Sequence, residues 1–252
     1  MTHSTSDIFA DWLAALEARH LADLRVPEVT RALRALSSAY VQRRHKVAHG
    51  APLDSHGKRA AFALFYAPLH FLAAQLVVEA VSAQQPAPAS LVDIGCGTGA
   101  AGAAWALAAG RIPIVGIDRH PWAVEEARWT YRALGLQGTA RQGDAARLPA
   151  LRAGTAVLAA YVLNELPDAS RQALEDGLLA AASRGVSVLV LEPIARSLTP
   201  WWDGTARRFI AAGGRADEWR FAVDLPPLIE KFDRAAGLNH QTLTARSLFV
   251  RG

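Results

Sequence analysis

Cysteine is almost absent from this chain. Cys96 is the only cysteine among its 252 residues. A single thiol cannot form a disulfide within the chain, and it cannot build a metal cluster held by cysteines. Stability must therefore come from an apolar core. Apolar residues make up 51% of the chain, which is enough for a substantial core in one or two domains.

Signals for membrane insertion and export are also missing. No run of about 18 uncharged apolar residues offers a membrane span. The first residues, Met1 to Asp7, lack the basic and then apolar pattern of a secretory signal peptide. We therefore expect a soluble, cytoplasmic protein without a membrane partner.

Acidic residues are scarce in one segment of a chain whose net charge is +4. Between residues 31 and 59, Asp54 is the only acid. The basic residues there are Arg31, Arg34, Arg43, Arg44, Lys46, Lys58 and Arg59. Two interpretations are open: an anion-binding face for nucleic acid, or a solvated helix face and loop. His45 and His49 lie in the same segment, but no third ligand accompanies them, so we expect no metal site.

The most informative segment is residues 91–102, Leu-Val-Asp-Ile-Gly-Cys-Gly-Thr-Gly-Ala-Ala-Gly. It predicts an apolar strand, a turn with three alternating glycines, and an alanine-rich helix. Glycine lets a ligand approach the backbone closely, and a helix N-terminus directs free N–H groups at it. The glycine spacing also satisfies the dinucleotide pattern G-x-G-x-x-A. However, Asp93 would repel a pyrophosphate and suits a positively charged ligand.

Three later segments end apolar runs with polar residues, at helix-length intervals. The first, residues 114–118, reads Ile-Val-Gly-Ile-Asp. The second, residues 140–145, reads Ala-Arg-Gln-Gly-Asp-Ala. The third, residues 157–167, reads Val-Leu-Ala-Ala-Tyr-Val-Leu-Asn-Glu-Leu-Pro. Ligands of open α/β sheets bind beyond such carboxyl ends of strands, so we expect these segments to meet at one site.

In order and spacing, these motifs resemble the class I S-adenosylmethionine-dependent methyltransferases over about residues 88–252. The resemblance implies S-adenosylmethionine as cofactor, and its ammonium and sulfonium suit Asp93. By analogy, Asp118 accepts hydrogen bonds from the ribose, and Asp144 faces the adenine amino group. The implied cofactor-binding residues are Asp93, Gly95, Cys96, Gly97, Gly99, Asp118, Arg119, Asp144, Ala145 and Tyr161.

The expected fold is α/β, a doubly wound, mostly parallel seven-stranded sheet of the Rossmann-like methyltransferase type with an N-terminal helical extension. We expect residues 1–88 to form a helical region that covers the active site, and residues 89–252 to bind the cofactor. An apolar helix over 60–81 should kink or break at Pro68, because proline lacks an N–H and clashes with the preceding turn.

Later in the chain, a helix is predicted from Asp168, capped by that acid, followed by a buried parallel strand at 186–193. Further helices are expected at 203–212 and 226–236. The sequence leaves open whether 219–223 or the tail 240–251 forms each of the last two strands.

Four residues near the expected methyl group are catalytic candidates: Tyr161, Asn164, Glu165 and Glu192. Asn164 and Glu165 could hydrogen-bond or deprotonate the acceptor. Alternatively, Asn164 caps a turn and Glu165 belongs to the first turn of a helix. The Asn-Glu-Leu-Pro string differs from the Asp/Asn-Pro-Pro-aromatic string of enzymes that methylate exocyclic base amines, which argues against that chemistry. Cys96 lies in the cofactor turn, so covalent methylation at C5 of a pyrimidine is not expected.

Residues that could contact the acceptor are Arg43, Arg44, Lys46, Tyr66, Trp201 and Trp202. The two tryptophans follow the fifth strand, where an indole can stack on a base or close a pocket against water. Ordinary packing of the loop onto the sheet is the alternative.

The acceptor stays open among three functions. Residues 38–44, the helix with Pro68, residues 161–166 and the Leu-Glu-Pro end at 191–193 resemble the methyltransferase-like family of small-ribosomal-subunit assembly proteins of bacteria and mitochondria. That resemblance implies RNA of the small ribosomal subunit as acceptor. Cysteines that hold an iron–sulfur cluster in longer members are absent here, so no metal cluster is expected. The alternatives are a small-molecule methyltransferase and a non-catalytic S-adenosylmethionine-binding assembly factor. The oligomeric state is not predicted.

Overall fold

The structure is a computed structural model that describes residues 5–42, 53–238 and 240–252. The chain divides into two compact units. The first unit comprises Met1–His70 and Ala222–Leu243, and the second comprises Phe71–Phe221 and Thr244–Gly252. The sequence-based division at residue 88, which concerned function, stays a prediction.

The first unit is built from helices. They are α1 (Thr5–His20), α2 (Val26–Gln42), α3 (His56–Ala61), the π-helical turn η3 (Phe62–Tyr66), the first turn of α4 (Ala67–Ala80), and α9 (Pro227–Ala235). Within the unit, α2 packs on α3 and α9, and α1 packs on η3. Apolar side chains at helical spacing, such as Trp12 and Leu16 in α1 and Leu33 and Leu36 in α2, are buried.

Of the predicted kink or break at Pro68, the break is wrong, because one continuous helix runs from His56 to Ala80. The turn that precedes the proline is the π-helical turn η3, in which the N–H of Ala67 bonds the carbonyl of Phe62, five residues earlier. This helix is long and apolar enough to cross a membrane, yet 67% of its most apolar window is buried inside the protein. Such burial is typical of a core helix.

The second unit contains a seven-stranded sheet in the order β3-β2-β1-β4-β5-β7-β6. The strands are β1 (Ser90–Ile94), β2 (Ile114–Asp118), β3 (Gly138–Gln142), β4 (Thr155–Ala160), β5 (Ser187–Glu192), β6 (Arg215–Ala222) and β7 (Thr242–Val250). The first five strands in this order are parallel, whereas β7 runs antiparallel to β5. The predicted fold class is confirmed, and residues 215–222 and 242–250 form the two strands that the sequence left open.

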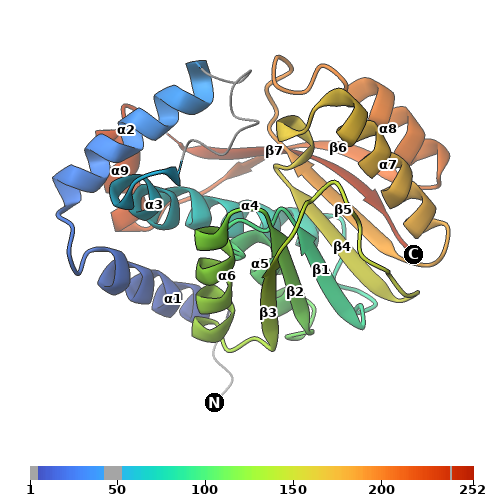
Figure 1. The fold of residues 1–252 in the computed structure, drawn as a ribbon, viewed down its shortest axis with the longest axis horizontal. Helices are drawn as coiled ribbons and strands as arrows, with labels where there is room; N and C mark the ends of the chain where they lie inside the picture. The colour runs from blue at the N-terminus through green and yellow to red at the C-terminus, as the bar shows by residue number, and fades with distance from the viewer. Residues whose placement is uncertain (1–4, 43–52, 239) are drawn as a thin grey trace. The chain divides into compact units, whose positions relative to one another are not determined.

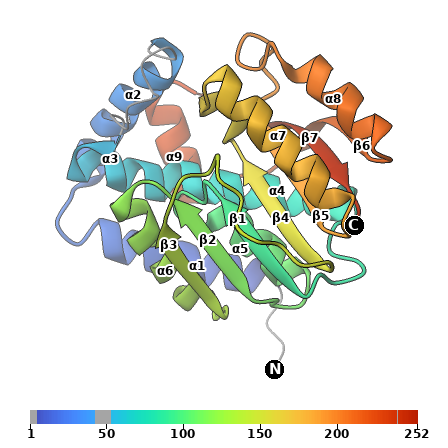
Figure 2. The same cartoon turned by 45° about the vertical axis from the view of Figure 1, so that its right-hand side comes forward.

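Besides the rest of α4, the second unit contains the helices α5 (Ala100–Ala108), α6 (Pro121–Ala133), α7 (Asp168–Ala182) and α8 (Trp202–Ala211). α5 packs on β1 and β2, α6 on β2 and β3, and α7 on β5. Both views of the ribbon show α7 and α8 side by side (Figures 1 and 2). Asp168 does not cap α7 as predicted, since Pro167 is the N-cap residue. Asp168 instead pairs with Arg171 at 2.8 Å.

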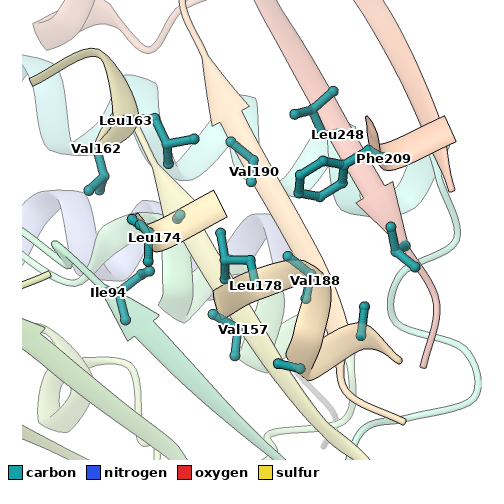
Figure 3. Packing of buried hydrophobic residues seen from close by; sticks show 14 of the residues in the cluster. Ile94, Val157, Val162, Leu163, Leu174, Leu178, Val188, Val190, Phe209 and Leu248 are labelled. Carbon is teal, nitrogen blue, oxygen red and sulfur yellow. The ribbon is translucent and has the colours of Figure 1, made fainter. Parts of the chain in front are cut away.

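The core of the second unit lies between the middle of the sheet and the helices α7 and α8. Figure 3 shows Val157 of β4, Val188 of β5, Leu178 of α7 and Phe209 of α8 packed together. All four are 0% exposed, and each such side chain contributes about 1.5–3 kcal/mol of hydrophobic stabilisation. This packing fixes β4 and β5 next to each other, so the residues that follow them emerge at one edge of the sheet.

Candidate cofactor and acceptor site

The glycine turn between β1 and α5 needs glycine for conformation and for space. Gly95, Gly97 and Gly99 have φ angles of 64°, 52° and 78°, which side chains disfavour. A Cβ atom on Gly95 would also lie 2.5 Å from Cγ2 of Val162. No side chain caps the N-terminus of α5, which follows the turn. A helix N-terminus without a side-chain cap can direct N–H groups at a ligand.

Asp93 is a buried acid with no basic partner among the residues that the structure describes. Its side chain is 1% exposed. Burial raises the pKa of Asp93 to about 8, opposed by the backbone N–H of Gly102 and reinforced by Asp118. A carboxylate in such a place lacks a compensating positive charge. It therefore fits a ligand that carries a cationic group.

Asp118, at the end of β2, is bonded to the glycine turn. Its Oδ2 accepts a hydrogen bond from the backbone N–H of Gly97 at 2.9 Å, and its Oδ1 accepts one from that of His120 at 2.8 Å. Each carboxylate oxygen retains a further lone pair, which suits hydroxyl donors such as those of a ribose. Its neighbour Arg119 is exposed.

The loop after β3 lies beside the end of β2, because the backbone N–H of Gly143 donates to the carbonyl of Asp118 at 2.9 Å. Asp144 is exposed and accepts a hydrogen bond from the N–H of Ala146 at 3.0 Å. Ala145 is half-buried. The predicted ribose residue at the end of β2 and the predicted adenine residue in the loop after β3 thus belong to neighbouring segments.

The segment after β4 holds three of the catalytic candidates. Tyr161 has a φ of 60°, which is rare for a residue with a side chain, and its N–H donates to the carbonyl of Leu191 at 2.7 Å. The 3₁₀ turn η4 (Leu163–Glu165) follows directly. Val162 and Leu163 point into the core and anchor this turn (Figure 3). Strained backbone held by a packed core is common at functional sites.

Glu192, the last residue of β5, binds this turn from the neighbouring strand. Its Oε1 accepts hydrogen bonds from the N–H of Leu163 at 2.8 Å and of Asn164 at 3.4 Å. The side chain is 0% exposed, and burial raises the pKa of Glu192 to about 8. At pH 7 the carboxyl group is therefore mostly neutral.

Two polar atoms near this turn are buried without a hydrogen-bond partner among the described residues: Oε2 of Glu192 and Oδ1 of Asn164. Such atoms are uncommon in folded proteins and mark places where a ligand can supply the missing partner. The structure thus brings Asn164 and Glu192 together at the turn after β4. Glu165, by contrast, is exposed. The catalytic assignment of all four residues stays a prediction.

The acceptor candidates are scattered over the chain. Arg43, Arg44 and Lys46 lie outside the described residues. Tyr66 ends η3 in the first unit, where its ring centroid is 6.3 Å from that of His70. Burial raises the pKa of Tyr66 above its ordinary value.

The two tryptophans at the start of α8 have different surroundings. Trp202 is 6% exposed and belongs to the core, which favours the packing interpretation for this residue. Trp201 is half-buried, with the guanidinium of Arg171 at 5.0 Å from its ring. It lines an open hollow of about 390 Å³ between α7 and α8, together with the ion pair of Glu175 and Arg208. Among the described residues, no group of His, Cys, Asp or Glu side chains is arranged to hold a metal ion.

Sequence reasoning missed the residues that pack beneath the glycine turn, in particular Tyr131 of α6 and Gly116 of β2. A glycine in the interior of a strand was the available signal, because it marks a close approach of another group. Val162 was also missed as the side chain that restricts position 95 to glycine.

Comparisons with known proteins agree with this geometry. Residues 91–184 match the family model described as a methyltransferase domain. No curated protein matches the sequence. The resemblance to the ribosome-assembly family stays a prediction.

Two solved structures share the fold. The plantazolicin methyltransferase BpumL was solved in complex with SAH. The similarity covers 97% of this chain and 99% of that protein, with a TM-score of 0.54 and 10% sequence identity. For the mitomycin 7-O-methyltransferase MmcR, the similarity covers 100% of this chain and 76% of that protein, with a TM-score of 0.52 and 17% sequence identity. The matched stretch of the methyltransferase-domain model contains the glycine turn, Asp93 and Asp118, so the comparisons support an S-adenosylmethionine-dependent methyltransferase.

Proposed function

We propose that this enzyme transfers the methyl group of S-adenosylmethionine to a small-molecule acceptor. The observation that carries the proposal is the turn after β4, where the buried Oδ1 of Asn164 has no donor among the described residues. A few polar atoms in mainly apolar surroundings are typical of small-molecule sites. The two solved structures of similar fold are named for methylation of plantazolicin and of mitomycin, which supports this class of acceptor.

When bound, S-adenosylmethionine supplies a methyl group that is already activated by its sulfonium. The residues that would hold it are the glycine turn, Asp93 and Asp118, for the reasons of charge and hydrogen bonding given above. The chain's main task is then to align the acceptor and exclude water.

We assign distinct tasks to the residues that follow β4 and β5. Glu192, which is wholly buried, holds the turn through the N–H groups of Leu163 and Asn164. The Asn164 side chain orients the acceptor by accepting a hydrogen bond from it. The Glu165 side chain reaches the surface, but desolvation raises its pKa to about 7, so close to neutral pH the fraction that is a carboxylate can take the proton that a hydroxyl or amine acceptor loses.

The described basic residues support a small molecule over RNA. Nε of Arg34 donates to the carbonyl of Ala235 at 2.6 Å, and Nε of Arg59 donates to that of Leu53 at 2.9 Å. Nζ of Lys58 pairs with Asp54 at 2.9 Å. These contacts within the first unit use part of the hydrogen-bonding capacity of each basic side chain. RNA is the second candidate acceptor, favoured by the Arg43, Arg44 and Lys46 run. Residence in the cytoplasm is part of the proposal.

The test is incubation of the protein with methyl-labelled S-adenosylmethionine and cell extract, followed by separation of small molecules, RNA and protein. We expect label in the small-molecule fraction, with strong reduction for Asn164→Ala. Label in RNA would favour the second candidate. Cofactor binding without transfer to any fraction would favour the non-catalytic assembly factor.

A further inference from the structure

Two glycines of the sheet stand where neither a turn nor a positive φ requires glycine. Gly116 lies in the interior of β2, and Gly138 begins β3. A Cβ atom on Gly116 would lie 2.7 Å from the hydroxyl oxygen of Tyr131, and one on Gly138 would lie 2.5 Å from Cδ2 of the same ring. Glycine weakens a strand, so glycine at both positions lowers the stability of the sheet but leaves room for the side chain of Tyr131.

The ring of Tyr131 also reaches the cofactor turn. A Cβ atom on Gly99, the N-cap residue of α5, would lie 2.7 Å from Cε1 of Tyr131. The thiol of Cys96 lies beside the phenol hydroxyl, since a Cβ atom on Gly116 would meet both groups. Tyr131 is 0% exposed. It therefore projects from α6 and fills the space between β2, β3 and the underside of the glycine turn.

We infer that Tyr131 is a positioning residue for cofactor binding. Its ring supports Gly99 and Cys96 from below, and thereby fixes the N–H groups at the start of α5 in the arrangement that binds the adenosyl ligand. Because it is fully buried, it acts through the turn and not by contact with the ligand. This inference rests on the assignment of S-adenosylmethionine as cofactor.

The experiment compares Tyr131→Leu and Tyr131→Phe in calorimetric titrations with SAH. Leucine removes the ring that contacts Gly99, so we expect at least about tenfold weaker binding. Phenylalanine keeps the ring, so we expect affinity within about threefold of the unsubstituted protein. Leu178→Ala in α7 is the control, because Leu178 is equally buried but packs in the core between α7 and the sheet. It should lower the unfolding temperature without changing the SAH affinity.

The outcomes separate the inference from the cofactor assignment. If the unsubstituted protein does not bind SAH, the cofactor assignment fails. If the unsubstituted protein and Tyr131→Leu bind SAH equally well, only the inference is overturned. The inference is also overturned if Leu178→Ala weakens SAH binding as much as Tyr131→Leu does. Should Tyr131→Leu not fold, Gly116→Ala tests the same contact from the other side. Its methyl group would press on the phenol hydroxyl and the Cys96 thiol, and unchanged SAH affinity in that variant would overturn the inference.

Discussion

Glu192→Gln should change how the stability of this protein depends on pH. The pKa of Glu192 is about 8 in the folded protein, compared with 4.5 for an ordinary glutamate. Between these values the folded state holds a proton that the unfolded state has released. The contribution of Glu192 to stability is therefore greatest below about pH 4.5 and falls with rising pH, by up to about 1.4 kcal/mol per pH unit, until about pH 8. Glutamine stays neutral at every pH and retains the oxygen that accepts from Leu163 and Asn164.

The advantage of the variant should consequently grow by about 2.5 kcal/mol from pH 5 to pH 7, slightly less than two pH units at the full slope, because the unfolded glutamate is still partly protonated at pH 5. A fixed offset is also expected, because the glutamine amide brings one more N–H than the acid into a site where Oε2 already lacks a partner. The growth with pH is independent of this offset.

Urea unfolding at several pH values measures the effect directly. Glu125→Gln, on the exposed side of α6, is the control and should follow the unsubstituted protein at every pH. Parallel stability curves for Glu192→Gln and the unsubstituted protein would show that Glu192 is ionised when folded, and the reasoning about its burial would then be wrong.

Three further predictions concern the ligand sites. At pH 7, Asp93, whose pKa is about 8, should release about 0.9 proton when SAH brings its ammonium group, measured by calorimetry in buffers of different ionisation enthalpy; zero release would contradict the pairing. Gly95→Ala should abolish SAH binding because its Cβ would lie 2.5 Å from Val162, and addition of Val162→Ala should restore part of the affinity; no restoration would leave the φ of 64° as the sole constraint. Neutralising Arg43, Arg44 and Lys46 together should leave small-molecule turnover intact, whereas loss of RNA binding with a salt slope flatter by about 0.7 per lost contact would favour the RNA candidate.

The sequence predicted the parts of the site that depend on local pattern. The glycine turn, the acid at the end of β2 and the apolar runs of β4 and β5 are each encoded within a few residues. A parallel sheet then brings the carboxyl ends of its strands to one edge. For this reason, the positions of Asp118 and Glu192 at the ends of their strands, and of Tyr161 directly after β4, followed from the local pattern.

The remainder depends on contacts between distant segments. Burial of Glu192 beneath the turn after β4 results from packing across the sheet, and so does its raised pKa. Trp202 belongs to the core because α8 lies against α7, which the sequence of the loop does not indicate. The π-helical turn before Pro68 was missed since a single proline usually breaks a helix, and a wider turn that retains the helix has no distinct local pattern.

The most direct test of the central claim is a calorimetric titration of the protein with SAH and, separately, with NAD. Binding of SAH, weakened by about 1.5–3 kcal/mol in Asp118→Ala through loss of its hydrogen bonds, is the predicted result, with no measurable binding of NAD. Tight binding of NAD without binding of SAH or S-adenosylmethionine would contradict it, because the glycine turn would then serve a dinucleotide despite Asp93.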